Sequence, residues 1–352
     1  MRSVRKMFRI NGKEIGGDSD CYVIAEIGHN HQGSLELAKR MITSAAECGA
    51  NAVKLQKRNN SKLFTKSYYN RPYNSENSFG KTYGEHREAL EFGKSEYVIL
   101  AEHSKSVGVD FFATAFDFDS ADFLSKLDVP AFKIASGDLK NIPLITHVAS
   151  FGKPLFVSTG GADITAVDAA VDTLKKSGTP YCIMQCTAGY PAEWDELNLN
   201  VISTFKERYS DDVIGFSSHD NGIAMAVAAY VLGARVIEKH FTLDRSMKGT
   251  DHAFSLEPQG MEKMIRDLKR LKVALGDGVK RQYPSEIDPL IKMGKKCVWA
   301  FELPKGTVLE MSMVEFRSPG DGVPPSEIYK LIGKKLIRDV ATEDPITSSD
   351  LE

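Results

Sequence analysis

Polar residues alternate with apolar ones at the ends of several short hydrophobic runs. Lys54 and Gln56 end one run, and Glu238 and His240 end another. Successive residues of a β-strand point to opposite faces, so the members of each pair share one face. The same alternation holds in a third run, which ends in Gly215, Ser217 and His219. The pattern predicts that polar groups from separate strands face one common interior.

Two lysines, Lys54 and Lys133, lie within such apolar runs. A buried ammonium group is costly unless an anion pairs with it, so both lysines indicate a bound anion. Three serines at the ends of nearby runs, Ser136, Ser158 and Ser217, offer hydroxyl donors. Each serine alone is more typical of a helix cap, but together with both lysines they predict a cradle for phosphate or carboxylate.

His219 and His240 end two consecutive runs. A single histidine is more often a satisfied structural residue, but two imidazoles on neighbouring strands can share one metal ion. A metal ion that is held by only a few protein ligands keeps coordination positions open for a substrate oxygen, which the metal would polarise. His29, His31 and Asp251 are close enough in the pattern to contribute.

Two acidic residues are candidates for general acid or base chemistry. Glu26 ends the first run, where it could also contact a substrate hydroxyl, and Asp138 follows Ser136. No glycine-rich loop of the P-loop or dinucleotide-binding kind is present. Cys182 and Cys186 are interpreted as buried thiols, because no partner base is evident.

Eight short apolar runs alternate with helical patterns, which predicts parallel strands closed into a (β/α)8 TIM barrel. The first helix has Ser34 as its N-cap and Gly49 directly after its end. The predicted strands are 22–27, 52–56, 110–115, 131–134, 155–158, 182–186, 213–217 and 236–240. The helical patterns include 34–48, 95–107, 163–176 and 222–232. Most of the candidate residues lie near strand carboxyl ends, where barrel active sites are built.

Two segments depart from this alternation. The segment 60–91, rich in Tyr and Asn, is interpreted as either a lid over the site or a passive surface loop. The tail predicts a small module, with strands at 297–301 and 308–310 around the turn Pro304-Lys305-Gly306. The expected domains are a barrel over 1–283, a linker over 284–295 and a small domain over 296–352. A module of this size is marginal alone and is expected to dock on a barrel.

The composition excludes several classes of protein. The 352 residues carry a net charge of −2, which gives no general attraction to nucleic acid or to an acidic membrane. The five cysteines are scattered and form no CxxC pair, which is typical of reduced thiols in the cytoplasm. Residues 1–17 lack the apolar core of a signal peptide, and no apolar run is long enough to span a membrane. We expect a cytoplasmic protein.

The strand ends resemble those of the sialic acid synthases, in the same order along nearly the whole chain. The tail around 317–325 is similar to the antifreeze-like (SAF) domain of that family. The matching segments are EIGHNHQG at 26–33, VKLQ at 53–56, FKIASGD at 132–138, VSTG at 157–160, CTAGYP at 186–191, GFSSH at 215–219, EKHFT at 238–242 and GTDH at 249–252.

The resemblance implies condensation of phosphoenolpyruvate with the aldehyde of an open-chain N-acyl amino sugar, such as N-acetylmannosamine. It implies that His219 and His240 hold Mn2+ or Mg2+, and that the small domain of one subunit covers the barrel of another in a swapped homodimer. The residues implied to bind phosphoenolpyruvate are Lys54, Lys133, Ser136, Ser158 and Ser217. Those implied to position the sugar and the intermediate are Glu26, Gln56, Tyr190 and Asp251.

Several positions depart from the family pattern. Asp138 stands where the family usually has Glu, and Ala188 replaces an Asn that helps to hold phosphoenolpyruvate. The Arg that reaches the acyl group precedes Pro-Gly in the family, whereas here Ser318 has that place and Arg317 lies one residue earlier. His29 stands where the family has an apolar residue. These departures put the identity of the sugar in question.

Three alternatives stay open. The acceptor could be a precursor of legionaminic or pseudaminic acid, or, more remotely, the sugar phosphate of an octulosonate-phosphate synthase. A second phosphate on the sugar would need extra cations near segment 60–91, for which Lys57 and Arg58 are available. A weakly active sugar-binding homologue is the alternative from another class, and the intact lysines and histidines argue against it.

Overall fold

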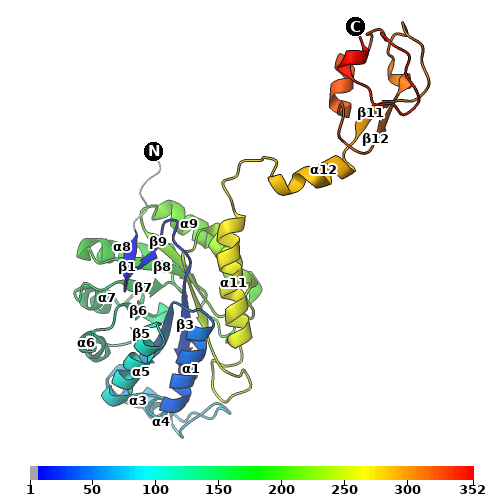
Figure 1. Ribbon diagram of the computed structural model, residues 1–352. Helices are drawn as coiled ribbons and strands as arrows, with labels where there is room; N and C mark the ends of the chain where they lie inside the picture. The colour runs from blue at the N-terminus through cyan, green and yellow to red at the C-terminus, as the bar shows by residue number, and fades with distance from the viewer. Residues whose placement is uncertain (1–6) are drawn as a thin grey trace. The chain divides into compact units, whose positions relative to one another are not determined.

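The computed structural model describes residues 7–352, which form two compact units divided between Leu275 and Gly276. The first unit is a closed barrel of eight parallel strands surrounded by helices, which confirms the predicted (β/α)8 fold (Figure 1). The barrel strands are β3 (Tyr22–Gly28), β4 (Ala52–Lys57), β5 (Asp110–Ala115), β6 (Phe132–Ile134), β7 (Leu155–Ser158), β8 (Tyr181–Cys186), β9 (Val213–Ser218) and β10 (Val236–His240). They run in sequence order, and β10 closes the ring against β3.

The helices between the strands begin and end where local signals place them. Ser34 caps the first helix, as predicted, by accepting a hydrogen bond from the Leu37 amide at 3.2 Å, and Gly49 follows in a left-handed conformation with φ of 89°. The barrel helices are α1 (Leu35–Glu47), α5 (Lys94–Ser106), α6 (Phe118–Lys126), α7 (Ile142–Ala149), α8 (Ile164–Ser177), α9 (Asn200–Arg208), α10 (Ala224–Leu232) and α11 (Pro258–Ala274).

An N-terminal hairpin that the sequence analysis missed closes the amino end of the barrel. Its strands are β1 (Phe8–Ile10) and β2 (Lys13–Ile15). Asp110, at the start of β5, connects the hairpin to the barrel. Its buried carboxylate accepts hydrogen bonds from Asn11 and Lys13 of the hairpin and from Tyr22 of β3, at 2.7–3.1 Å. The expectation about a signal peptide over 1–17 falls in part on residues 1–6, which lie outside the described residues.

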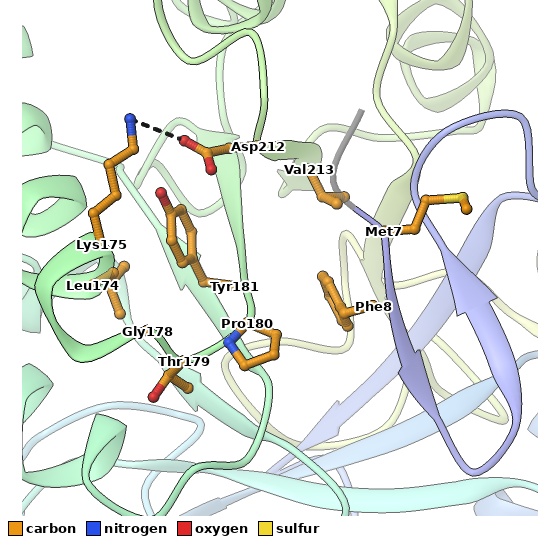
Figure 2. A pocket seen from close by; sticks show the side chains of 10 residues that line it. All are labelled: Met7, Phe8, Leu174, Lys175, Gly178, Thr179, Pro180, Tyr181, Asp212 and Val213. Carbon is orange, nitrogen blue, oxygen red and sulfur yellow. Dashed lines mark ion pairs between the residues drawn. The ribbon is translucent and has the colours of Figure 1, made fainter. Parts of the chain in front are cut away.

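A small cavity of about 140 Å³ lies near the amino ends of β8 and β9, where Phe8 reaches toward Pro180 and Val213 (Figure 2). Lys175 and Asp212 form an ion pair of 3.4 Å at its edge. Because barrel chemistry takes place at the carboxyl ends of the strands, we interpret this cavity as part of the closure by the hairpin.

The segment 60–91 is folded rather than an irregular loop. It contains α2 (Asn60–Leu63), α3 (Lys66–Tyr69) and α4 (Tyr83–Ala89). The Tyr83 ring lies at its centre, with the rings of Phe64, Tyr68 and Tyr73 at 5.1, 4.9 and 5.5 Å between centroids. An aromatic cluster of this kind can hold the segment in one conformation.

The second unit has its own small core, which includes Trp299, Leu309 and Ile328. Helix α12 (Ile287–Met293) lies within the segment expected to be a linker, and β11 (Lys296–Trp299) pairs antiparallel with β12 (Val314–Arg317). The prediction of a strand at 308–310 is therefore wrong. Val308 forms only an isolated bridge with Lys335, because β11 takes its partner from farther along the chain.

Short 3-10 helices complete the secondary structure, namely η1 (Ser136–Asp138), η2 (Trp194–Glu196), η3 (Pro284–Glu286), η4 (Met311–Met313), η5 (Pro325–Lys330) and η6 (Ser348–Asp350). Within residues 7–352, no helix combines the length and the apolar character that crossing a bilayer requires.

Candidate active site

A cavity of about 690 Å³ opens at the carboxyl ends of the barrel strands. The site residues predicted from the sequence line it, except Asp138, Arg317 and the two further metal-ligand candidates His29 and His31. The predicted residues in its wall are Glu26, Lys54, Gln56, Lys133, Ser136, Ser158, Tyr190, Ser217, His219, His240 and Asp251. The alternation of polar and apolar residues along the strands therefore identified the interior face correctly.

Lys54 lies between two buried carboxylates. Its Nζ is 2.7 Å from Glu26 Oε2 and 3.6 Å from Glu238 Oε1, and it donates to Thr114 Oγ1 at 2.8 Å. Burial alone would lower the pKa of Lys54, but Glu238 and Glu26 together raise it above the ordinary value. Lys54 is therefore an ammonium group whose charge is already largely balanced.

Glu26 is the acid whose protonation state is most open to change. Burial raises its pKa to about 7, with Lys54 opposing the shift and Glu238 adding to it. Gln56 donates to Glu26 Oε1 at 2.8 Å and so fixes the carboxylate. A carboxyl group that titrates near neutral pH can exchange protons with a substrate, as the sequence analysis expected.

Lys133 is more weakly paired than Lys54. Its Nζ donates to Ser158 Oγ at 2.6 Å, and the nearest carboxylate oxygen, Glu238 Oε1, is 3.8 Å away. Burial lowers the pKa of Lys133, with Glu238 opposing the shift. Glu238 accepts a hydrogen bond from Ser217 at 3.3 Å and lies between both lysines, although the sequence analysis gave it no role.

The three predicted serines belong to the cavity and not to helix caps. Ser158 and Ser217 contact Lys133 and Glu238, and Ser136 accepts a hydrogen bond from the Gly160 amide at 3.0 Å. A side chain at Gly160 would lie 2.8 Å from the Ser136 hydroxyl, so this close approach requires glycine. The capping alternative is therefore wrong for these positions.

His219 and His240 face each other with ring centroids 5.3 Å apart. The Nδ1 of His219 is 2.8 Å from the carbonyl oxygen of Thr187, which leaves Nε2 as the free lone pair. Burial lowers the pKa of both imidazoles, that of His240 strongly, so both are neutral, as metal ligands must be.

These two histidines fit a divalent cation as part of an open site. The Nδ1 of His240 is buried, has no hydrogen-bond partner in the described part of the chain, and lies 3.7 Å from Asp251 Oδ2. Within residues 7–352 no group of three or more His, Cys, Asp or Glu side chains is arranged to hold a metal ion. Two protein ligands would leave the other positions to water and substrate.

Four candidates lie outside the cavity wall: Asp138, Arg317, His29 and His31. His29 contacts Arg58 and Arg87, and the His31 ring stacks on Phe92. Asp138 ends η1, where it accepts from Asn141 at 3.3 Å, and burial raises its pKa. Arg317 is exposed in the second unit, where it pairs with Glu315 and Glu343.

Besides Glu238, several other residues in the cavity wall were not assigned to the site from the sequence. They include Arg58, Asn77, Arg87, Thr114 and Phe116. Thr114 and Phe116 continue the alternation along β5, so parity could have found them. Asn77 and Arg87 come from segment 60–91, and Asn77 accepts a hydrogen bond from the Gly249 amide at 2.9 Å. The segment therefore forms part of the wall, and the alternative of a passive surface loop is disfavoured.

Comparison with known proteins identifies the family. Residues 41–280 match the NeuB family, and residues 298–352 match the SAF domain. The chain belongs to the NeuB family. This assignment confirms the resemblance that the strand-end motifs carry.

Relatives match the NeuB-family chain over nearly its full length. N-acetylneuraminate-9-phosphate synthase of Homo sapiens is 40% identical over 95% of this chain and 94% of its own. N,N'-diacetyllegionaminic acid synthase of Legionella pneumophila is 36% identical over 93% and 94%. Among solved structures, N-acetylneuraminic acid synthetase of Leptospira borgpetersenii has 33% identity and a TM-score of 0.72, over 82% of this chain and 96% of that one. These relatives are enzymes that make nine-carbon sugar acids.

Proposed function

We propose that this NeuB-family enzyme condenses phosphoenolpyruvate with an N-acyl amino-sugar aldehyde and water to give a nonulosonic acid and phosphate. The enol carbon of phosphoenolpyruvate forms a C–C bond to the aldehyde carbon, whose oxygen gains a proton. Water adds at the neighbouring carbon and loses a proton, and phosphate leaves by cleavage of the C–O bond. The single observation that supports this reaction best is the meeting of two buried lysines with two neutral histidines in one cavity.

Lys133 is the stronger candidate to bind the phosphoenolpyruvate anion. Lys54 is already balanced by Glu26 and Glu238, whereas Lys133 has one carboxylate oxygen at 3.8 Å. The Ser158 hydroxyl holds the Lys133 ammonium group in position. Charge-assisted hydrogen bonds from such groups are the strong contacts to phosphate and carboxylate oxygens. Ser136 and Ser217 add hydroxyl donors at the same end.

His219 and His240 would hold Mn2+ or Mg2+, which when bound supplies polarisation of the aldehyde oxygen. Glu26, with a pKa of about 7, would accept the proton of the attacking water or hold a sugar hydroxyl. Gln56 and Asp251 line the same cavity and would position the sugar, and the Tyr190 ring lies 4.1 Å from that of His219. Asp138 and Arg317 keep their proposed roles as an acid and a contact to the acyl group.

The names of the relatives leave the acceptor open between a precursor of N-acetylneuraminate and one of legionaminic or pseudaminic acid. The name of the Homo sapiens relative includes a phosphate on the product, whereas that of the Legionella pneumophila relative does not. A weakly active sugar-binding homologue is disfavoured, because such a protein has no need to bury two lysines beside carboxylates.

We also propose a cytoplasmic homodimer in which the small domain of one chain covers the barrel of the other. The five free cysteines favour a reducing compartment. Exposed apolar side chains on and near α12, such as Tyr283, Leu290 and Met293, favour a contact with another surface. Light scattering coupled to size exclusion would test the dimer, and a monomer at micromolar concentration would contradict it.

The reaction is tested by incubating the protein with Mn2+, phosphoenolpyruvate and a panel of N-acyl hexosamines. We expect phosphate release together with a product whose mass equals the sum of the sugar and pyruvic acid. Lys133→Met should abolish most of this activity, whereas Lys153→Met, at an exposed lysine paired with Asp128, should not. If no sugar in the panel leads to phosphate release, the proposal is wrong.

A further inference from the structure

Two arginines in the cavity wall have no carboxylate partner among residues 7–352. Arg58 follows β4 and is 8% exposed, and Arg87 lies in α4 of segment 60–91. Over residues 7–352, the hydrogen-bond partners of these guanidinium groups are neutral side chains, and neither forms an ion pair. Arg58 is buried and Arg87 is half-buried. A guanidinium that is shielded from water without a counter-ion is costly, so these two positive charges are available to an anion.

Both arginines converge on one histidine. Arg58 Nη1 is 3.0 Å from His29 Nε2, and Arg87 Nη1 is 3.1 Å from His29 Nδ1. Burial and the two arginines keep the pKa of His29 well below its ordinary value, so the ring is neutral. A neutral imidazole has one N–H and one lone pair, and arginine can only donate, so His29 can accept from just one of them. The Nη1 group of the other arginine therefore faces an N–H group and has no acceptor on His29.

The remaining contacts hold the two guanidinium groups at the cavity and leave donors free. Arg58 stacks on Phe116 at 3.7 Å and donates to Gln56 Oε1 at 2.7 Å. Arg87 donates to the Tyr83 hydroxyl at 2.8 Å. Each guanidinium has five N–H donors, so both keep donors for a ligand.

Lys57, the other cation considered from the sequence, does not belong to this group. Its Nζ is 2.6 Å from Glu91 Oε1 and donates to the Phe92 carbonyl at 2.9 Å. It is absent from the cavity wall. The unpaired charge of this region is therefore concentrated on Arg58 and Arg87.

Gln56 connects the arginines to the reacting end of the site, because its amide contacts Glu26 through Nε2 and Arg58 through Oε1. An acceptor whose aldehyde lies near Glu26 and the histidines could extend its far end toward the arginines. Two guanidinium groups match the charge of a phosphate monoester, which is close to a dianion at pH 7, and their planar donors fit its oxygens.

We propose that Arg58 and Arg87 bind a phosphate group on the terminal carbon of the acceptor sugar, so that the enzyme acts on a phosphorylated N-acyl hexosamine. This inference rests on the proposed condensation reaction. Phosphoenolpyruvate adds three carbons ahead of the aldehyde carbon, so a 6-phosphate on the hexosamine becomes a 9-phosphate on the product.

The test compares N-acetylmannosamine 6-phosphate with N-acetylmannosamine as acceptors, following phosphoenolpyruvate consumption and product mass. The wild-type enzyme should prefer the phosphorylated sugar in kcat/KM by at least roughly 10-fold, the value of one charge-assisted hydrogen bond. Arg87→Gln should reduce this preference roughly 10- to 100-fold, mainly through KM, and Arg87→Lys should restore part of it. Arg266→Gln, at an exposed arginine paired with Asp267, is the control and should keep the preference.

Equal or better use of the unphosphorylated sugar by the wild-type enzyme would overturn the inference while leaving the condensation intact. So would an Arg87→Gln variant whose KM rises for phosphoenolpyruvate with the sugar preference unchanged, because the arginines would then bind phosphoenolpyruvate. If no sugar is condensed, calorimetric titration with N-acetylmannosamine 6-phosphate alone still decides the point. We expect its Kd to rise at least roughly 10-fold in Arg87→Gln, and an unchanged Kd would overturn the inference.

Discussion

Glu26 and Lys54 face each other across β3 and β4, with the carboxylate Oε2 2.7 Å from the ammonium Nζ and each side chain only 2% exposed. Together with Glu238 at 3.6 Å, this carboxylate balances most of the charge of Lys54 before any substrate binds. The carboxylate oxygen that pairs with Lys133 is farther away, at 3.8 Å, so Lys133 keeps more of its charge for a ligand.

The activity should depend on pH through Glu26. Its pKa of about 7 means that the carboxylate, the form that accepts a proton, becomes the major species only above that pH. We expect kcat/KM to rise as the pH increases through about 7 and to level off above it. Glu26→Gln should be much less active and should lose this rise. A Glu26→Gln profile with the same inflection would assign it to another group.

Replacing Lys133 by Met should weaken phosphoenolpyruvate binding without weakening the fold. We expect kcat/KM for phosphoenolpyruvate to fall roughly 100-fold, or about 2.7 kcal/mol, through the loss of charge-assisted hydrogen bonds. The thermal midpoint should stay the same or rise, because a buried charge is removed while Glu238 keeps Lys54 at 3.6 Å. Thermal unfolding measured beside the kinetics checks this, and a large fall in the midpoint would indicate a structural role instead.

The metal site is tested by His219→Ala and His240→Ala. Each variant should lose most of the activity and should bind Mn2+ at least roughly 10-fold more weakly, as measured by electron paramagnetic resonance of the free ion. His147→Ala, at a histidine on α7 paired with Asp122 at 2.7 Å, is the matched control and should behave like the wild type. Activity that survives in both variants after chelation would show that the assignment is wrong.

The closure of the amino end of the barrel should depend on Asp110. This carboxylate accepts from Tyr22 at 2.7 Å as well as from Lys13 and Asn11, so Asp110→Ala leaves several donors unsatisfied. We expect the free energy of unfolding in urea to fall by about 2–4 kcal/mol. Asp20→Ala removes an exposed aspartate from its pair with Lys272 and should cost less than about 1 kcal/mol. Equal losses would argue against the closing role of the hairpin.

Gly84→Ala tests whether segment 60–91 acts on the substrate or only covers the surface. A Cβ atom at Gly84 would overlap the Tyr69 ring, so α4, which carries Arg87, must move relative to α3. We expect the KM for the sugar to rise roughly 10-fold or more through displaced contacts. Lys66→Ala, at an exposed residue of α3, is the control and should leave the KM for the sugar unchanged. Unaltered kinetics in Gly84→Ala would favour the passive surface loop.

The amino-acid sequence by itself determined the eight strands and the face of each strand that turns inward. The side-chain period of a strand is two, so Lys54, Gln56, Ser217 and His219 reveal a common face without any knowledge of their neighbours. The apolar runs and the capping signals at Ser34 and Gly49 are local in the same sense. For that reason most of the strand-end residues that line the cavity could be predicted.

Only the tertiary structure decided which charges in the site are balanced and which are not. The partners of Lys54 come from β3 and β10, and Arg87 reaches the cavity through the folding of a long insertion around Tyr83. The hairpin contacts of Asp110 join residues about a hundred positions apart. Pairing of this kind depends on distances between segments that no local period encodes, so the unpaired arginines beside His29 emerge only from the folded chain.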